Sequence, residues 1–177
     1  MGGYMAWRPA PDPRAGQVHV FMPPLAVLEH SRAQLRVGEA SPRTVLDAVL
    51  AGVAEAAAVP VPLLLGDRKA VWIVEARMAA YAAARRVGAV LAGRGARAFT
   101  DRAGRRVARM LSYPAIAERM GGRDHTTVIS GVRVCEARIA GGDRALLAVV
   151  QAGVAAGLRF HRHRAQGRAG LRQAVMS

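Results

Sequence analysis

The clearest run of apolar positions follows Ser41-Pro42, where a capping hydroxyl precedes a proline suited to the first turn of a helix. The apolar residues after this start share one helical face, and the pattern stops before Pro60. They are Val45, Leu46, Val49, Leu50 and Val53. The pattern predicts an amphipathic helix as the first element of a folded domain.

Capping residues, glycines and prolines divide the rest of this domain into further helices. A short apolar turn at 63–66 leads to a long helix from Arg68 to about Val87, which Asp67 caps and Gly88 ends. Four more helices are predicted, each after a side chain that can accept a hydrogen bond from the helix start. Their caps are Thr100, Ser112, Asp124 and Asp143, and their last residues lie near Leu111, Met120, Ala140 and Gly157.

The two ends of the chain differ from this middle part. Residues 1–24 are rich in proline and glycine and indicate an extended arm, followed by a short helix from Pro24 to about Leu35. The tail from Arg159 to Ser177 holds five arginines and no acid, and we expect a disordered tail that seeks phosphates, with nonspecific DNA binding or RNA binding as the alternatives. The expected organisation is an N-terminal arm (1–40), a helical domain (41–140) with a basic insert (about 88–110), and a C-terminal helix with a basic tail (141–177).

Composition favours helices over sheets. Hydrophobic residues make up 52% of the chain, many of them alanine, whereas aromatic residues make up only 5%. Because alanine is the best helix former and no long alternating apolar run occurs, the predicted fold class is all-α.

The charge of the chain indicates a polyanionic partner. Lys+Arg 26 stand against Asp+Glu 12, a formal net charge of +14 at pH 7, and every basic residue except Lys69 is an arginine. DNA, RNA and an anionic membrane all match this charge, and the arginine fork favours nucleic acid because it pairs with phosphates and guanine edges. A GC-rich genome explains the choice of arginine over lysine, but little of the net charge.

Several other classes of function are disfavoured. Cys135 is the only cysteine, which leaves no intramolecular disulfide and no cysteine-based zinc site. Without an 18-residue apolar stretch or a signal-peptide core, we expect a cytoplasmic, nucleoid-associated protein with no membrane partner. No nucleophile motif accompanies Asp124 and His125, whose side chains project about 100° apart on a helix. We expect no enzyme activity, no small-molecule substrate, no cofactor and no metal site.

Two of the predicted helices form a helix-turn-helix pattern. The helix Pro114–Met120 is joined by Gly121-Gly122 to the helix that Asp124 caps. In such a motif the second helix enters the major groove with its N-terminus first, where its partial positive charge favours DNA. Five polar residues in a row, Arg123 to Thr127, stand at this start, and a helix start facing the core would not need them. The pattern predicts a reader of duplex DNA.

The segment Tyr113–Val128 also resembles a known family. Its core, Gly-Gly-Arg-Asp-His-Thr-Thr at 121–127, is similar to the signature of the C-terminal DNA-binding domain (domain IV) of the bacterial replication initiator DnaA. The similarity extends upstream over Leu64–Lys69 and Arg77–Ala82, and more loosely over the helix at 45–53. It covers residues 41–140.

The resemblance implies roles for individual residues. Asp124, His125 and Thr126 would contact base edges in the major groove, where an acid accepts from cytosine and a threonine methyl meets thymine. A second group would bind the DNA backbone or the minor groove. Its members are Arg68, Lys69, Arg77, Arg85, Pro114, Arg123 and Thr127.

Three departures separate this chain from the initiator. The basic loop of the family continues here as the apolar segment Ala70–Val74, and the insert at about 88–110 is additional. The ATPase motif Gly-x-x-x-x-Gly-Lys-Ser/Thr is absent from the sequence. We therefore expect a DNA site that differs from the initiator box on its minor-groove side, and no ATP-driven melting of an origin by this chain alone.

These features predict a sequence-specific transcription regulator, in particular an activator. The chain resembles the DNA-binding half of the alphaproteobacterial activators of gene transfer agents, the Gaf family, which implies control of gene transfer agent or prophage-like genes. Besides double-stranded DNA, the implied partners are a sigma-factor-like protein or RNA polymerase, and integration host factor. The alternatives are a replication protein that binds an origin or competes for initiator boxes, and a nucleoid or RNA-binding protein without sequence preference.

Overall fold

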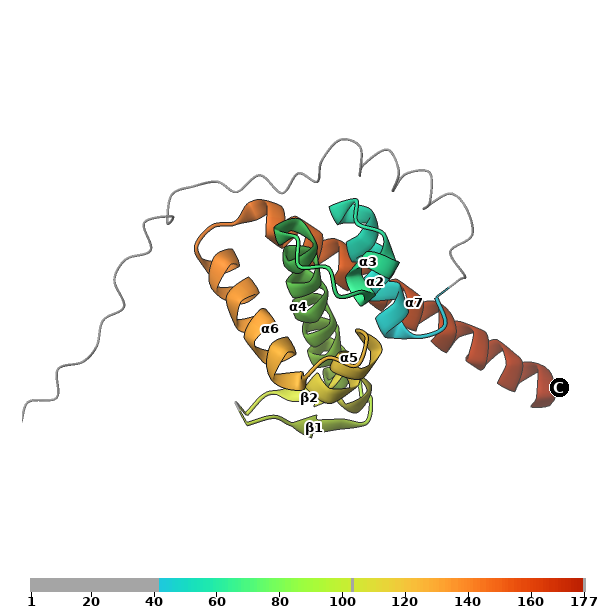
Figure 1. Ribbon diagram of the computed structural model, residues 1–177. Helices are drawn as coiled ribbons and strands as arrows, with labels where there is room; N and C mark the ends of the chain where they lie inside the picture. The colour runs from blue at the N-terminus through green and yellow to red at the C-terminus, as the bar shows by residue number, and fades with distance from the viewer. Residues whose placement is uncertain (1–41, 103, 177) are drawn as a thin grey trace, which may run out of the picture.

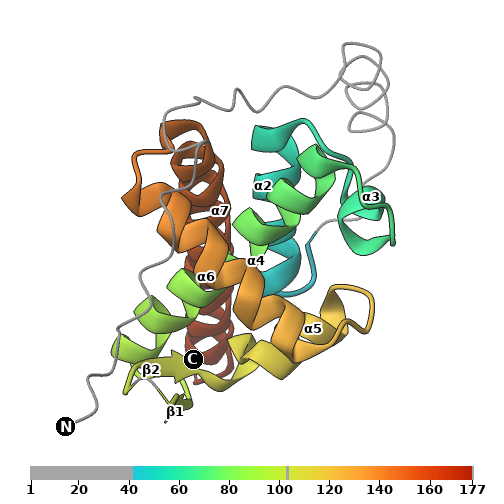
Figure 2. The same ribbon diagram turned by 60° about the vertical axis from the view of Figure 1, so that its left-hand side comes forward.

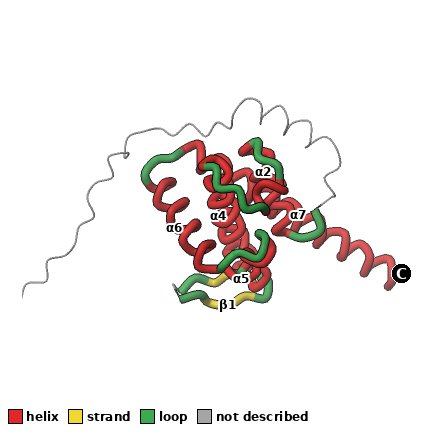
Figure 3. Tube along the Cα trace, in the orientation of Figure 1, coloured by secondary structure: helices red, strands yellow, loops and turns green. Residues whose placement is uncertain are grey.

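The structure, a computed structural model, describes residues 42–102 and 104–176, with side chains up to residue 167. Within these residues the chain forms six α-helices and one two-stranded hairpin (Figures 1 and 3). The predicted all-α class is therefore confirmed only as mostly helical. The expected N-terminal arm (1–40) and its short helix lie outside the described residues.

The long helix α4, Val71–Gly93, runs through the middle of the molecule (Figures 1 and 2). It contacts α2 (Val45–Ala57), α6 (His125–Ala140), α7 (Arg144–Met176) and the hairpin. Much of its buried surface is alanine, so neighbouring helices can approach its backbone closely. None of the described helices is long and apolar enough to cross a bilayer.

Helix α2 confirms the predicted apolar face but begins later than expected. All five residues of the predicted stripe are buried in the core. The cap is Thr44 rather than Ser41: the Thr44 hydroxyl accepts from Asp47 N at 3.1 Å, and Asp47 Oδ2 accepts from Thr44 N at 3.0 Å. This reciprocal pair satisfies two backbone donors at once, and it needs an acidic residue three positions after the cap, which Thr44 has in Asp47.

The segment after α2 forms the short helix α3, Val61–Leu65, where a turn was predicted. Helix α4 then begins at Val71, so the predictions of a start at Arg68 and a cap at Asp67 are wrong. Gly88 does not end α4 but lies inside it. A Cβ at Gly88 would come 2.8 Å from Val107 Cγ1 of the hairpin, so this glycine marks a close approach instead of a helix end.

The helix predicted at 101–111 is wrong: this part of the insert is a β-hairpin. Strand β1, Ala98–Thr100, pairs antiparallel with β2, Arg106–Ala108, and a single 3-10 turn, η1 (Arg109–Leu111), follows. Asp101 closes the hairpin turn, since its N–H donates to Arg105 O at 2.9 Å and its Oδ1 accepts from Arg105 N at 3.0 Å. Its carboxylate bonds the turn backbone instead of capping a helix.

The remaining helices begin where the sequence predicts. Helix α5, Tyr113–Arg119, is capped by Ser112; α6 is capped by Asp124; and Asp143 Oδ1 accepts from Leu146 N at the start of α7. The apolar stripe of α7 packs on the domain, with Leu146 and Val150 fully buried.

Helix α7 continues to Met176. The predictions that it ends near Gly157 and that a disordered tail follows are therefore wrong. A Cβ at Gly157 would come 2.6 Å from Val49 Cγ2, so this glycine lets α7 pack closely on α2. The residues beyond it are mostly good helix formers such as alanine, arginine and glutamine.

Candidate nucleic-acid interface

Two glycines build the turn between α5 and α6. Gly121 has φ +88° and Gly122 φ +69°, values that side chains with a Cβ rarely adopt. A Cβ at Gly121 would also lie 2.5 Å from Leu65 O, whereas one at Gly122 would meet nothing within 4 Å. The backbone conformation of the turn therefore explains both glycines of the Gly-Gly-Arg-Asp-His-Thr-Thr motif without any ligand.

The two helices of the motif share a fully apolar contact. Ile116 of α5, Met120 directly after α5 and Val128 of α6 have no exposed surface, and Val132 of α6 is also buried. Tyr81 of α4 lies under Gly131, where a Cβ would come 2.8 Å from the Tyr81 ring. This packing fixes the direction in which the first turn of α6 points out of the protein.

The first turn of α6 presents its polar side chains to solvent. Asp124, His125, Thr126 and Thr127 are all exposed, with 64% of the Asp124 side chain and 57% of the His125 side chain accessible. The interior position that would have contradicted the base-reading hypothesis is therefore not observed. We call these four residues the α6 tip.

Hydrogen bonds within the α6 tip hold it in one arrangement. Asp124 Oδ1 accepts from the backbone N–H and from the hydroxyl of Thr126, each at 2.7 Å. The Thr126 hydroxyl bond, followed by the backbone bond, lowers the pKa of Asp124, so this carboxylate is ionised at neutral pH. His125 Nδ1 lies 3.6 Å from Asp124 Oδ1. An acceptor, an imidazole and a threonine methyl thus stand together on an exposed helix start.

Arg77, predicted to bind a phosphate, is instead buried, with 4% of its surface exposed. Its Nε donates to Leu64 O at 2.9 Å, and its two other nitrogens donate to the carbonyls of Leu63, Gly66 and Arg68. Burial, followed by repulsion from Arg123, lowers its pKa. In this conformation the Arg77 guanidinium binds the chain's own loop, and little of it remains exposed for a phosphate.

Arg85 is likewise turned inward, with 7% of its surface exposed. Its guanidinium pairs with Asp101 of the hairpin at 2.6 Å, donates to Leu111 O at 3.3 Å and lies 3.9 Å over the Tyr113 ring. This arginine joins the hairpin to the first residue of α5. The predicted phosphate contact does not fit that position.

Arg123 follows the glycine turn but does not extend from the α6 tip. Its Nη2 donates to the carbonyl of Gly66 and lies 3.7 Å from Asp67, while its Nε is buried without a hydrogen-bond partner among the described residues. The side chain therefore fastens the turn to the loop at 66–70, which we call the 66–70 loop. These contacts position the turn, and Arg123 also lines the groove beside Thr126 and Thr127, so its DNA contact stays a prediction.

The other predicted backbone contacts are exposed. Arg68 and Lys69 lie in the 66–70 loop, and Pro114 lies in the first turn of α5. Lys69, Thr126 and Thr127 line one groove between the 66–70 loop, α4 and α6. Arg77 and Arg123 line the same groove, so the structure brings five of the predicted site residues together. Ser130, one turn after Thr126, lines the same groove and was missed, although its helical spacing could have indicated it.

The apolar segment that replaces the continuation of the family's basic loop lies at the start of α4. Val71 has 72% of its surface exposed, and Val74 lines the same groove as Lys69. Across the groove, α6 contributes the exposed Val134. This edge of the site therefore carries methyl groups beside a single lysine.

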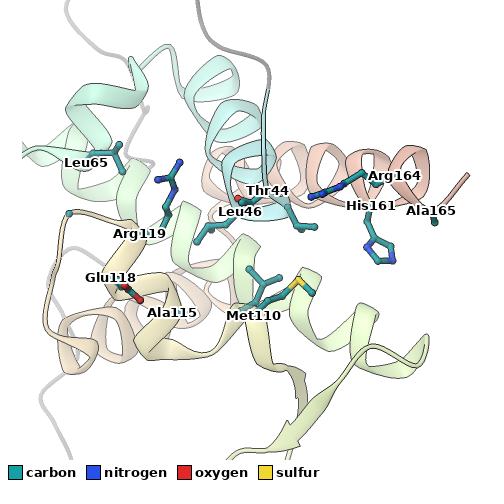
Figure 4. A pocket seen from close by; sticks show the side chains of 13 residues that line it. Thr44, Leu46, Leu65, Met110, Ala115, Glu118, Arg119, His161, Arg164 and Ala165 are labelled. Carbon is teal, nitrogen blue, oxygen red and sulfur yellow. The ribbon is translucent and has the colours of Figure 1, made fainter. Parts of the chain in front are cut away.

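A second, larger groove is shown in Figure 4. It is lined by Thr44, the cap of α2, by Leu46 of α2, by Glu118 and Arg119 of α5, and by His161 of α7. Arg119 is already paired with Asp47 at 2.5 Å. In the described part of the chain, no three His, Cys, Asp or Glu side chains are grouped so as to hold a metal ion.

Comparisons of the chain with models of protein families, with curated proteins and with solved structures found no match.

Proposed function

We propose that this protein binds double-stranded DNA in a sequence-specific manner and reads base edges with the α6 tip. The observation that carries the proposal is the exposed helix start Asp124–Thr127, set after a two-glycine turn in a chain of net charge +14. A helix N-terminus with short polar side chains, steered by a strongly positive protein, has the size and charge to enter the major groove.

Each exposed group has a matching partner on duplex DNA. Asp124 accepts from a cytosine amino group, His125 exchanges a hydrogen bond with a base edge, and the Thr126 methyl meets a thymine methyl. Thr127 and Lys69, which line one groove, bind phosphates, and so do the exposed Arg68 and the α5 start at Pro114. Arg77 and Arg123 hold this surface in place through their hydrogen bonds to the segment 63–68.

The biological role that we propose is transcription regulation, in particular activation. Support comes from the resemblance of residues 41–140 to domain IV of the initiator DnaA, and of the chain to the Gaf family. On this proposal the partners are double-stranded DNA, a sigma-factor-like protein or RNA polymerase, and integration host factor. Mapping the bound DNA across the genome in the native cell tests it: a regulator occupies a few promoters, whereas a replication protein occupies initiator-type boxes.

Replacing His125 with alanine is expected to cost about 1–3 kcal/mol of binding to the preferred DNA site and to relax base preference at one position. The reason is that alanine removes the hydrogen bond of the imidazole to a base edge. The fold should be unaffected, because the exposed imidazole is paired only with its neighbour Asp124 among the described residues. Binding to a randomised pool and to the selected site is measured by fluorescence anisotropy at fixed salt.

Two matched variants control this experiment. His163→Ala removes an exposed histidine from α7 and should change nothing. Lys69→Ala should weaken binding to all sequences alike and reduce the salt slope by about one unit. Equal losses of His125→Ala on the selected site and on random DNA would contradict the assignment of the α6 tip to base reading.

A further inference from the structure

The hairpin region is the most basic short stretch of the described surface. Residues 94–109 contain six arginines and one aspartate, a net charge of +5, and all six arginines are exposed. They are Arg94, Arg97, Arg102, Arg105, Arg106 and Arg109. The single acid, Asp101, is compensated by its pairs with Arg85 and Arg105, so the hairpin presents almost pure positive charge.

The hairpin is fixed to the body of the protein. Val107 of β2 is buried against Gly88 of α4, and Arg109 N donates to Arg97 O at 2.8 Å at the base of the hairpin. The buried pair of Arg85 with Asp101 holds the turn end. Because the hairpin is held at both ends, its backbone gives the arginines a fixed position on the body of the protein.

The same anchor also joins the hairpin to the helix-turn-helix. The 3-10 turn η1 runs from β2 directly into Ser112, the cap of α5, and Arg85 contacts both Leu111 O and the Tyr113 ring. In two views the hairpin lies at the same end of the molecule as α5 and the start of α6 (Figures 1 and 2). In a helix-turn-helix, the first helix lies across the DNA backbone.

We infer that the hairpin is a second DNA contact, which binds phosphates beside the site read by the α6 tip and lengthens the footprint on one side. This inference rests on the proposed DNA binding. Arginine forks match phosphate oxygens bidentately, and arginines supply all of the exposed charge of the hairpin. The contact therefore adds affinity that is independent of sequence.

The first test removes charge from the hairpin. The triple variant Arg102→Gln, Arg106→Gln and Arg109→Gln should lower the slope of log affinity against log salt by about 2–3, equally on selected and random DNA. The ratio between the two affinities should stay unchanged. The matched control, Arg144→Gln, Arg159→Gln and Arg162→Gln, removes the same charge from exposed positions of α7.

The outcomes separate the two proposals. An unchanged slope in the hairpin variant, or an equal loss in the α7 control, overturns the hairpin contact, even if the wild type discriminates between sites. A wild type that binds selected and random DNA alike overturns the proposed function itself. Circular dichroism verifies that each variant retains its helix content.

The second test locates the hairpin on DNA. Cys135 has no exposed surface, and burial raises its pKa to about 12, so a thiol placed by Arg102→Cys is the reactive one. An iron chelate attached there should cleave DNA on one flank of the selected site. Cleavage on neither flank would overturn the inference.

Discussion

Replacing Arg77 with alanine is expected to lower the free energy of unfolding by about 3–5 kcal/mol. The guanidinium donates to four carbonyls of the segment 63–68, and only 4% of Arg77 is exposed. Alanine would leave these acceptors without their donor in a site that water reaches poorly. Urea unfolding followed by circular dichroism measures the loss.

Two further variants define what Arg77 does. Arg77→Lys should recover only part of the stability, because one ammonium cannot replace a planar fork that meets several carbonyls. Arg68→Ala, an exposed arginine of the neighbouring loop, should change stability by less than about 0.5 kcal/mol. If Arg77→Ala were as stable as the wild type yet bound DNA weakly, the phosphate role expected from the sequence would be restored.

Local chemistry explains the parts of the fold that the sequence predicts well. Ser112, Asp124 and Asp143 each place an acceptor at a helix start, and all three caps are confirmed. The glycine turn at 121–122 and the apolar contact of Ile116 with α6 are also short-range features. The exposed tip of α6 follows from these, because the cap and the turn fix its direction.

Long-range contacts explain the parts that sequence reasoning missed. Gly88 and Gly157 each follow a helical pattern at a point where a glycine is typical of a helix end. In the structure each lies inside a helix, at a position that another segment approaches closely. Arg77 and Arg85 resemble surface cations because arginine is rarely buried, and only the folded chain shows which carbonyls and acids surround them. A pattern of residue types carries no information on such partners.

The same long-range contacts gather at one place behind the candidate interface. Arg77 and Arg123 both donate to the carbonyl of Gly66, and Gly121 faces the carbonyl of Leu65. The start of α6 is thus fastened to the segment 63–68, which ends in the exposed Arg68 and is followed by the exposed Lys69. This arrangement couples the position of the α6 tip to that of the 66–70 loop.

Replacing Gly121 with alanine is expected to destabilise the protein by about 3 kcal/mol. A left-handed backbone costs an L residue about 1–2 kcal/mol, and Gly121 has φ +88°. The added Cβ would also lie 2.5 Å from Leu65 O, a backbone atom that cannot rotate away. Either the turn or the segment 63–68 must shift, so thermal unfolding should occur at a lower temperature and DNA affinity should fall with it.

Gly122→Ala is the matched control, because it introduces the same methyl group one residue further on. Gly122 has φ +69°, but a Cβ there meets nothing within 4 Å, so only the backbone cost of about 1–2 kcal/mol applies. The difference between the two variants isolates the contact of the turn with Leu65. Equal destabilisation by both would mean that this contact does not hold the α6 tip, and that the glycines serve the turn alone.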